Sequence, residues 1–196
     1  MTVAEQVLQL LRSTDALLEG HFLLTSGQHS GSYVQCARVL QHPRHAEALG
    51  GWIADSFRDT AVDVVISPAV GGIVIGQEVA RALGVRAIFG EREGGLMTLR
   101  RGFEVAPRER VLVVEDVTTT GGSVREIMQM AQERQGQVVG VGAILNRSPG
   151  EIDLGVPLHA LALLRIQNYA PTACVLCRQG SQPVKPGSRQ LPGGAR

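Results

Sequence analysis

The chain has 196 residues, of which 44% are hydrophobic and 19% charged, and its 19 basic and 18 acidic residues leave a formal net charge of +1. A chain of this length can bury a full hydrophobic core as one domain, which excludes a small scaffold held together by disulfides or metals. A net charge so close to zero gives no reason to propose a nucleic acid or an anionic membrane as a partner.

The start of the chain lacks the features of an export signal. No cationic leader precedes an uninterrupted apolar stretch, and no later apolar run approaches the roughly 18 residues needed to cross a bilayer. The three cysteines are an odd number, and two of them lie three positions apart, which is not the pattern of a secreted disulfide framework. We therefore expect a soluble protein of the cytoplasm.

The first quarter of the chain predicts two helices around a polar segment. Apolar residues at near-helical spacing predict an amphipathic helix before Gly20. Residues 21–40 interleave short apolar runs with Ser, Gly and His, which indicates brief strands and a turn around residues 27–31. Pro43 suits the first position of a second helix, whose apolar face is expected to join the core. That face consists of Leu49, Trp52, Ile53 and Phe57.

From residue 62 onward, short apolar runs alternate with helical patterns. The runs fall at 62–66, 85–89, 111–114, 138–145 and 158–164. Continuous apolar runs are typical of strands buried on both faces, and their alternation with helices predicts a parallel α/β sheet with right-handed crossovers. Two helices lie between these runs, with apolar faces formed by Ile75, Val79, Ala80 and Leu83 and by Val124, Ile127, Met128 and Ala131. Residues 181–196 are rich in Pro and Gly, and we expect them to form a flexible tail.

The segment 111–123 (VLVVEDVTTTGGS) is the most informative one in the chain. Its buried strand delivers Glu115 and Asp116 to the edge of the sheet, and three threonines and two glycines then open a helix. Hydroxyls and free backbone N–H groups at a helix N-terminus can wrap a phosphate, and glycines permit its close approach. The carboxylates would repel that phosphate, so we expect them to accept hydrogen bonds from sugar hydroxyls or to bind a cation through water. Phosphate plus vicinal diol describes a ribose 5-phosphate; the alternative is a solvated strand end with a flexible turn.

This segment resembles the phosphoribosyl-pyrophosphate motif of the type I phosphoribosyltransferases, position for position. The stretches GHFLLTSGQHSGSYVQ, FGEREGGLMTLRRGF and ILNRSPG resemble the orotate phosphoribosyltransferase branch, and the similarity covers nearly the whole chain except the tail. The resemblance implies the type I phosphoribosyltransferase fold: a central, mostly parallel sheet flanked by helices, in a single domain over residues 1–180. A small hood would be formed by about residues 1–40 plus a C-terminal part.

The activity that the resemblance implies belongs to pyrimidine nucleotide (UMP) biosynthesis. The 5-phosphoribosyl group would pass from phosphoribosyl pyrophosphate to N1 of orotate, giving orotidine 5-phosphate and pyrophosphate. The resemblance further implies Mg²⁺ as cofactor. The ion would be held through substrate oxygens and water, and no residue is assigned as its direct ligand. It also implies a homodimer.

The resemblance assigns roles to individual residues. Glu115 and Asp116 would hold the ribose 2- and 3-hydroxyls, with Asp116 counted among the catalytic residues. The turn after the strand at 62–66 matches the pyrophosphate loop of the family, in which a strained, sometimes cis peptide turns N–H groups toward the leaving group; here that peptide is Ala69–Val70. A plain strand-to-helix turn is the alternative for Ala69, Val70 and Gly71. The 5-phosphate would be enclosed by Thr118, Thr119, Thr120, Gly121, Gly122 and Ser123, and Val117 is counted among the substrate-binding residues.

Arginines supply the remaining candidates. Residues 91–103 align with the mobile loop that closes over the neighbouring subunit's site in the family, with Arg92 and Arg100 as catalytic cations; a solvated hairpin around Gly-Gly is the alternative. Arg147 falls where the family holds the orotate carboxylate with a guanidinium, although an isolated arginine after a strand is more often a surface charge.

Three departures from the best-known family pattern stand out. Thr25 lies where many members carry Lys beside the orotate, Gly71 replaces a Lys in the pyrophosphate loop, and the mobile loop lacks both Lys and His. Either Arg92, Arg100 and Mg²⁺ supply the missing charge, or the substrate is not orotate.

Two other functions remain open. A purine phosphoribosyltransferase would use the same ribose-phosphate machinery, although the chain is poor in aromatic residues for stacking on a purine. A non-catalytic nucleotide-sensing or RNA-binding regulator could share the fold, although the near-zero charge disfavours RNA. A dinucleotide dehydrogenase is disfavoured because no strand is followed by G-x-G-x-x-G.

The cysteines and histidines carry weaker signals. Cys174 and Cys177 form a single CxxC, whereas a structural zinc site needs four ligands, and Cys36 with an arbitrary histidine is a poor completion. We therefore interpret the pair as two small residues in a turn. His21 and His29 lie in the segment that would fold over the base, and we interpret them as incidental histidines rather than catalytic ones.

Overall fold

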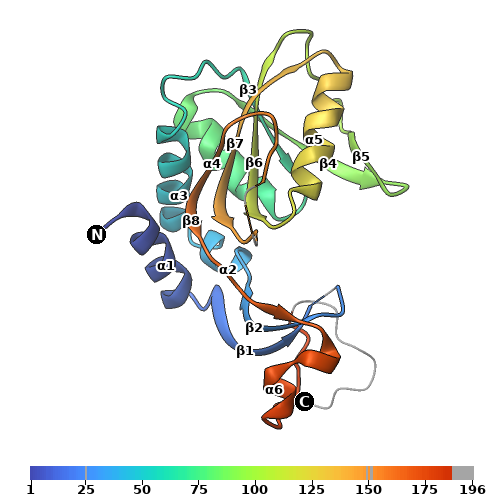
Figure 1. Ribbon diagram of the computed structural model, residues 1–196. Coiled ribbons are helices and arrows are strands. Elements are labelled where there is room, and N and C mark those ends of the chain that lie inside the picture. The colour runs from blue at the N-terminus through green and yellow to red at the C-terminus, as the bar shows by residue number, and fades with distance from the viewer. Residues whose placement is uncertain (25, 149, 151, 187–196) are drawn as a thin grey trace.

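The structure is a computed structural model that describes residues 1–24, 26–148, 150 and 152–186. Figure 1 shows an α/β body and, below it, a smaller antiparallel unit that contains β1, β2 and the C-terminal helix α6. Among the described residues, no helix has the length and apolar content that crossing a bilayer requires.

The helices and strands alternate through the body, as the apolar pattern predicts. The helices are α1 (Val3–Ser13), α2 (Ala37–Leu40), α3 (Pro43–Asp55), α4 (Gly72–Leu83), α5 (Gly122–Glu133) and α6 (Val175–Arg178), with a 3₁₀ turn at Pro171–Ala173. The strands are β1 (Leu17–Leu23), β2 (His29–Val34), β3 (Val64–Pro68), β4 (Arg86–Glu93), β5 (Leu96–Leu99), β6 (Arg110–Thr118), β7 (Gln137–Asn146), β8 (Leu158–Leu163) and β9 (Asn168–Tyr169). The main sheet has the order β5-β4-β3-β6-β7-β8, parallel except for the antiparallel pair β4–β5.

Local signals explain where several helices begin and end. The Thr2 hydroxyl accepts the Glu5 N–H, and the Glu5 carboxylate accepts the Thr2 N–H, which completes a capping box at the start of α1. Pro43 occupies the first turn of α3, where a missing N–H costs nothing. α4 ends at Gly84, whose φ of 71° is the left-handed conformation that glycine adopts without strain.

The body has two apolar cores, one on each face of the sheet. Alternate residues of a strand point to opposite faces, so Val65 packs with α3 and α4 while Val64 and Ile66 pack with α5. The predicted apolar faces of α4 and α5 are confirmed as core: Ile75, Val79, Ala80, Val124, Ile127 and Ala131 are all at most 1% exposed. The sheet is therefore covered by helices on both faces, the three-layer α/β arrangement expected for buried parallel strands.

We use the name hood for the three-stranded sheet β1-β2-β9 together with residues 170–186. The hood expected from the sequence also includes residues of α1 and α2; Val7 and Leu11 of α1 and Val39 of α2 pack in the same apolar core as α3 and α4. The start of the expected tail lies on the hood: the Val184 N–H donates to the carbonyl of His21 (2.8 Å), and the Leu23 N–H donates to the Val184 carbonyl (2.9 Å). The rest of that tail, residues 187–196, lies outside the described residues.

Two strand boundaries differ from the sequence expectation. β6 continues to Thr118, so Glu115 and Asp116 lie within the strand rather than after it. The reason is that β7 runs beside β6 to its end, with Thr118 paired to Asn146. β2 begins at His29, which places the hairpin turn before it rather than at residues 27–31.

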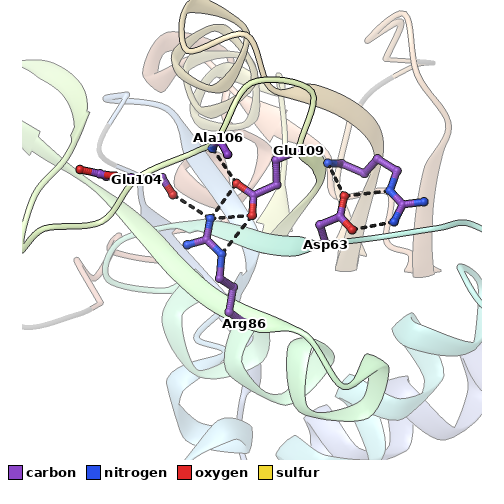
Figure 2. A network of polar contacts seen from close by, with 6 residues as sticks. Asp63, Arg86, Glu104, Ala106 and Glu109 are labelled. Carbon is purple, nitrogen blue, oxygen red and sulfur yellow. Dashed lines mark hydrogen bonds and ion pairs between the residues drawn. The ribbon is translucent and has the colours of Figure 1, made fainter.

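Charged residues close the amino-terminal edge of the sheet (Figure 2). Arg86, at the start of β4, donates to both carboxylate oxygens of Glu109 (each 2.7 Å) and to the Glu104 carbonyl (2.8 Å). Arg110, at the start of β6, binds both oxygens of Asp63 (2.6 and 2.8 Å). The hydrogen bonds from Arg110 hold the pKa of the Asp63 carboxyl well below its usual range.

Candidate active site

A polar cavity of about 210 Å³ opens where β6 passes into α5 at the carboxyl edge of the sheet. Gly121 makes the turn with a φ of 77°, and no side chain caps the start of α5 within the described residues. The first amide N–H groups of the helix are therefore left for a ligand or water, which makes this end of the helix an anion site. The cavity is lined by Arg92, Glu115, Val117, Thr118, Thr119, Thr120, Gly121, Gly122, Ser123, Val124 and Glu126.

The threonine at the end of β6 has an unusual environment. Thr118 is 2% exposed, and its Oγ1 has no hydrogen-bond partner among the described residues. A buried hydroxyl without a partner costs free energy unless a ligand or water completes it. This hydroxyl, Thr119, Thr120 and the start of α5 together line the cavity with the hydroxyl and N–H donors that a phosphate group would need. We call this segment the phosphate cradle (residues 118–123).

The two acids of β6 face different parts of the site. Glu115 is 7% exposed and lines the cavity of the phosphate cradle. Asp116, the next residue, points toward the β3–α4 turn: a Cβ atom added to Gly71 would lie 2.8 Å from its Oδ2. Its Oδ1 accepts the N–H of Val117 (2.8 Å). The turn can approach this carboxylate so closely because residue 71 has no side chain.

Burial dominates the electrostatics of Glu115. Loss of solvent, and then the negative charge of Asp116, raise the pKa of Glu115 from its ordinary value of 4.5 to about 9. Glu115 therefore carries a proton in the free protein at neutral pH. Hydroxyl groups of a bound sugar would donate to its oxygens and favour the ionised form.

The β3–α4 turn lies beside Asp116. The peptide bond between Ala69 and Val70 is cis, one of the two forms that the resemblance leaves open for this loop. The Ala69 N–H donates to the Gly90 carbonyl of β4 (2.8 Å), and the Val70 side chain is 81% exposed. The turn thus presents its backbone at the same edge of the sheet as the two acids.

Arg147 follows β7 and lies next to the phosphate cradle. Its backbone N–H donates to the Thr118 carbonyl (2.8 Å). Its side chain is half-buried, and its Nε has no hydrogen-bond partner among the described residues. Burial lowers the pKa of Arg147, and its ionisable neighbours are Tyr33 of β2 and Cys36. Among the described residues, the guanidinium of Arg147 is therefore incompletely paired and lies near Tyr33 of β2.

The segment 91–103 forms an antiparallel hairpin of β4 and β5 around Gly94 and Gly95. Arg92 lines the cavity of its own chain and pairs with Glu126 of α5 (2.8 Å). Arg100 instead pairs with Glu93 (3.4 Å) and is not among the cavity residues in the described part of the chain. Of the two predicted cations, the structure brings only Arg92 to the phosphate cradle.

Other residues complete the comparison with the sequence. Thr25 lies outside the described residues. Sequence reasoning missed Glu126, although its position one turn into α5, on the side of Gly122, is a signal for a residue facing the cavity. It also missed Tyr33, whose approach to Arg147 depends on how the hood packs.

Comparison with known proteins decides the family. The phosphoribosyl transferase domain model matches residues 35–154. The chain is 53% identical, over 187 residues, to the orotate phosphoribosyltransferase of Pelotomaculum thermopropionicum, and the alignment covers 95% of this chain and 98% of that protein. The chain belongs to the orotate phosphoribosyltransferase family.

Solved structures support the same fold at lower identity. The orotate phosphoribosyltransferase from Aeropyrum pernix superposes with a TM-score of 0.68 at 24% identity, covering 88% of this chain and 97% of that one. An adenine phosphoribosyltransferase from Thermoanaerobacter pseudethanolicus superposes with a TM-score of 0.59 at 18% identity, covering 68% of this chain and 88% of that one. The type I phosphoribosyltransferase fold is therefore confirmed. Because members that act on a purine share it, the fold alone does not choose the base.

Proposed function

We propose that this member of the orotate phosphoribosyltransferase family transfers the 5-phosphoribosyl group from phosphoribosyl pyrophosphate to N1 of orotate. The products are orotidine 5-phosphate and pyrophosphate, in the synthesis of pyrimidine nucleotides. The names of relatives about half identical to the chain support this activity, and the phosphate cradle beside two carboxylates suits the donor.

The donor is held at its 5-phosphate and at its ribose hydroxyls. Its 5-phosphate lies in the phosphate cradle, where the amides at the start of α5 and the hydroxyls of Thr118 and Thr119 surround it. Glu115 and Asp116 accept hydrogen bonds from the ribose hydroxyls, which fixes C1 of the ribose toward the β3–α4 turn.

Reaction occurs at C1 of the ribose without a protein nucleophile. The bond from C1 to the pyrophosphate oxygen breaks as the bond from orotate N1 to C1 forms on the opposite face, through a transition state with oxocarbenium character. The N1 proton of orotate is released to solvent, and the pyrophosphate leaves with the electron pair of the broken bond. The backbone N–H groups of Val70 and Gly71 and the guanidinium of Arg92 face the negative charge that grows on the leaving group. To reach the leaving group, Arg92 breaks its ion pair with Glu126 and pairs with the pyrophosphate instead. The closed site keeps water away from the sugar cation.

The residues at the site suit Mg²⁺ only as partners of a substrate-bound ion. They offer two carboxylates, Glu115 and Asp116, which face different parts of the site, whereas an all-protein Mg²⁺ cage needs more oxygen ligands. When bound through donor oxygens and water, Mg²⁺ would neutralise charge on the pyrophosphate.

Arg147 selects orotate over the other bases by binding its carboxylate. Its guanidinium is half-buried, its Nε lacks a partner among the described residues, and it lies next to the sugar site. A buried cation without a partner is costly, and a carboxylate on the base would pair with it through a planar fork. Orotate carries such a carboxylate, while adenine, hypoxanthine and uracil do not.

We also propose a homodimer that acts in the cytoplasm. Leu96, near the tip of the β4–β5 hairpin, is 76% exposed, which suits a hairpin that contacts a second copy near its site. None of the three cysteines, all of which lie in the described part of the chain, forms a disulfide, which suits a reducing compartment. Sedimentation of the active enzyme is expected to give a dimer; an active monomer would contradict this part of the proposal.

The activity is tested by following base absorbance with phosphoribosyl pyrophosphate and Mg²⁺. Orotate, adenine, hypoxanthine and uracil are supplied separately, and pyrophosphate release is measured in parallel. We expect turnover of orotate alone. Turnover of a purine without orotate would overturn the choice of base, and no turnover of any base would favour a nucleotide-sensing regulator on the same fold.

A further inference from the structure

Four side chains with metal-binding atoms meet in the hood, away from the phosphate cradle. His21 lies in β1, His29 begins β2, and Cys174 and Cys177 flank and enter the short helix α6. Their ligand atoms all lie within 4.8 Å of one another. Figure 1 shows α6 beside the β1–β2 hairpin, at the end of the molecule opposite the main sheet.

The distances between these atoms fit one metal ion. His21 Nε2 lies 3.0 Å from His29 Nδ1 and 3.4 Å from the Sγ of Cys174, and Cys177 Sγ lies 3.3 Å from His29 Nδ1 and 3.8 Å from His21 Nε2. A tetrahedron with metal–nitrogen bonds of about 2.0–2.1 Å and metal–sulfur bonds of about 2.3 Å has edges of about 3.3–3.8 Å.

Hydrogen bonding alone does not satisfy the cluster. Neutral His21 has one ring N–H and one lone pair, and its Nδ1 lies 3.1 Å from the Ser181 carbonyl, which can only accept. The proton therefore sits on Nδ1, and the single lone pair of Nε2 faces His29 and both sulfur atoms at once. A cation would use this lone pair together with the other three ligand atoms. The carbonyl would then orient the ring, as backbone carbonyls do behind metal-binding histidines.

Burial favours a structural role. His21 and His29 are each 6% exposed and Cys174 is 1% exposed, so three of the four ligands are shielded from solvent. Neither apolar cluster formed by the described residues includes Cys174, and the segment that carries the cysteines contains only a two-residue strand and two short helical turns. This segment has little apolar packing to hold it on the hood.

We propose that His21, His29, Cys174 and Cys177 bind one Zn²⁺ ion, which fastens the C-terminal segment to the β1–β2 hairpin. Two imidazoles and two thiolates in a closed tetrahedron are the donor set of structural zinc sites. Binding displaces the thiol protons to solvent, so it is coupled to their release. The interpretation of the CxxC pair as two small turn residues missed this set, because its partners are the two histidines of the hairpin and not Cys36.

The test is the metal content of the full chain, purified under reducing conditions from cells grown with zinc. We expect one zinc ion per chain in the wild type and close to none in Cys174→Ser, Cys177→Ser and His29→Gln. Cys36→Ser removes another buried thiol, and His45→Gln removes one ring of the His42–His45 pair, which has no cysteine beside it among the described residues. Both controls are expected to keep the zinc. A wild type without zinc, or loss of zinc in the controls as well, would overturn the proposal.

A second measurement does not depend on whether the variants fold. Wild-type chain stripped by a chelator is titrated with Co²⁺ and followed by visible and near-ultraviolet absorption. We expect intense bands of tetrahedral Co²⁺ and a thiolate-to-cobalt charge-transfer band that saturate at one equivalent. We also expect the Zn²⁺-loaded chain to have a higher Tm than the stripped chain. Absence of the charge-transfer band, or a Tm that Zn²⁺ does not change, would show that the cysteines hold no metal.

Discussion

Charged side chains are paired at the amino-terminal edge of the main sheet and incompletely paired at its carboxyl-terminal edge. At the amino-terminal edge, Asp63 and Glu109 are each bound by an arginine through two or more hydrogen bonds. At the carboxyl-terminal edge, Glu115 is buried beside another acid, and Arg147 keeps an Nε without a partner among the described residues. The same strands β4 and β6 contribute to both edges, so the difference does not come from the type of secondary structure.

This contrast separates groups that stabilise the fold from groups that wait for a ligand. Charges that are paired within the chain gain little from a ligand, whereas buried polar groups without partners gain most when a substrate supplies them. Substitutions at the carboxyl-terminal edge should therefore lower activity without lowering stability at neutral pH, and those at the amino-terminal edge should lower stability without lowering activity.

The largest effect is expected for Asp116→Asn. The amide keeps the shape but weakens the acceptor for the ribose hydroxyls, and charge-assisted hydrogen bonds contribute about 1.5–3 kcal/mol each. With one or two such bonds lost, kcat/KM for the donor should fall by about 100-fold, since about 1.4 kcal/mol corresponds to a factor of ten. Steady-state kinetics and a thermal melt check this.

The matched control for that substitution is Asp63→Asn at the opposite edge. It makes the same chemical change in the partner of Arg110 and should leave kcat/KM unchanged. Equal activity of the wild type and Asp116→Asn would remove Asp116 from the site.

The next effect is expected for Arg147→Gln. Loss of the guanidinium should raise KM for orotate by about 10- to 100-fold, as expected for one or two charge-assisted hydrogen bonds to a carboxylate. Tm should stay constant or rise, because a buried and incompletely paired charge is removed. Arg147→Lys keeps the charge without the fork and should recover only part of the affinity. A lower Tm together with an unchanged KM would identify Arg147 as a structural residue.

The pH dependence of stability tests Glu115. Its pKa is raised in the folded protein, so between pH 4.5 and about 9 the folded state keeps a proton that the unfolded state releases. The contribution of Glu115 to stability is thus fully present below pH 4.5 and is lost as the pH rises toward 9. The free energy of unfolding is measured with denaturant at several pH values for the ligand-free wild type and for Glu115→Gln. In this range it should fall with pH more steeply in the wild type, by up to about 1.4 kcal/mol per pH unit. Parallel curves would show that Glu115 is already ionised.

The smallest effect is expected at the amino-terminal edge. The pKa of Asp63 is lowered by Arg110, so its contribution to stability is present at neutral pH and is lost as the pH falls below the ordinary range of a carboxyl group. Asp63→Asn should lower Tm only slightly at pH 7, because the pair is exposed to solvent. The effect should be smaller at acidic pH, where the wild-type carboxyl group is losing its charge. A Tm difference that grows on acidification would contradict this sign.

Local patterns predict most of the body, and long-range contacts explain what they miss. The apolar runs and helical faces locate the parallel strands and α3, α4 and α5, because each pattern is decided by burial on one or both faces. The same strand–turn–helix logic finds the phosphate cradle. The length of β6 and the ion pair of Arg92 with Glu126 depend on neighbours that local patterns do not contain.

The hood shows this limit most clearly. Its histidines and cysteines are separated by about 150 residues in the chain. They come together only in the folded protein, where Val184 forms hydrogen bonds with β1. A lone CxxC in the sequence lacks two ligands, and nothing near it in the sequence supplies them.

A crystal structure of the chain with phosphoribosyl pyrophosphate tests the central claim most directly. We predict the 5-phosphate within residues 118–123, at the start of α5, and the ribose hydroxyls on Glu115 and Asp116. A donor bound elsewhere, with this segment free of phosphate, would contradict the assignment of the site.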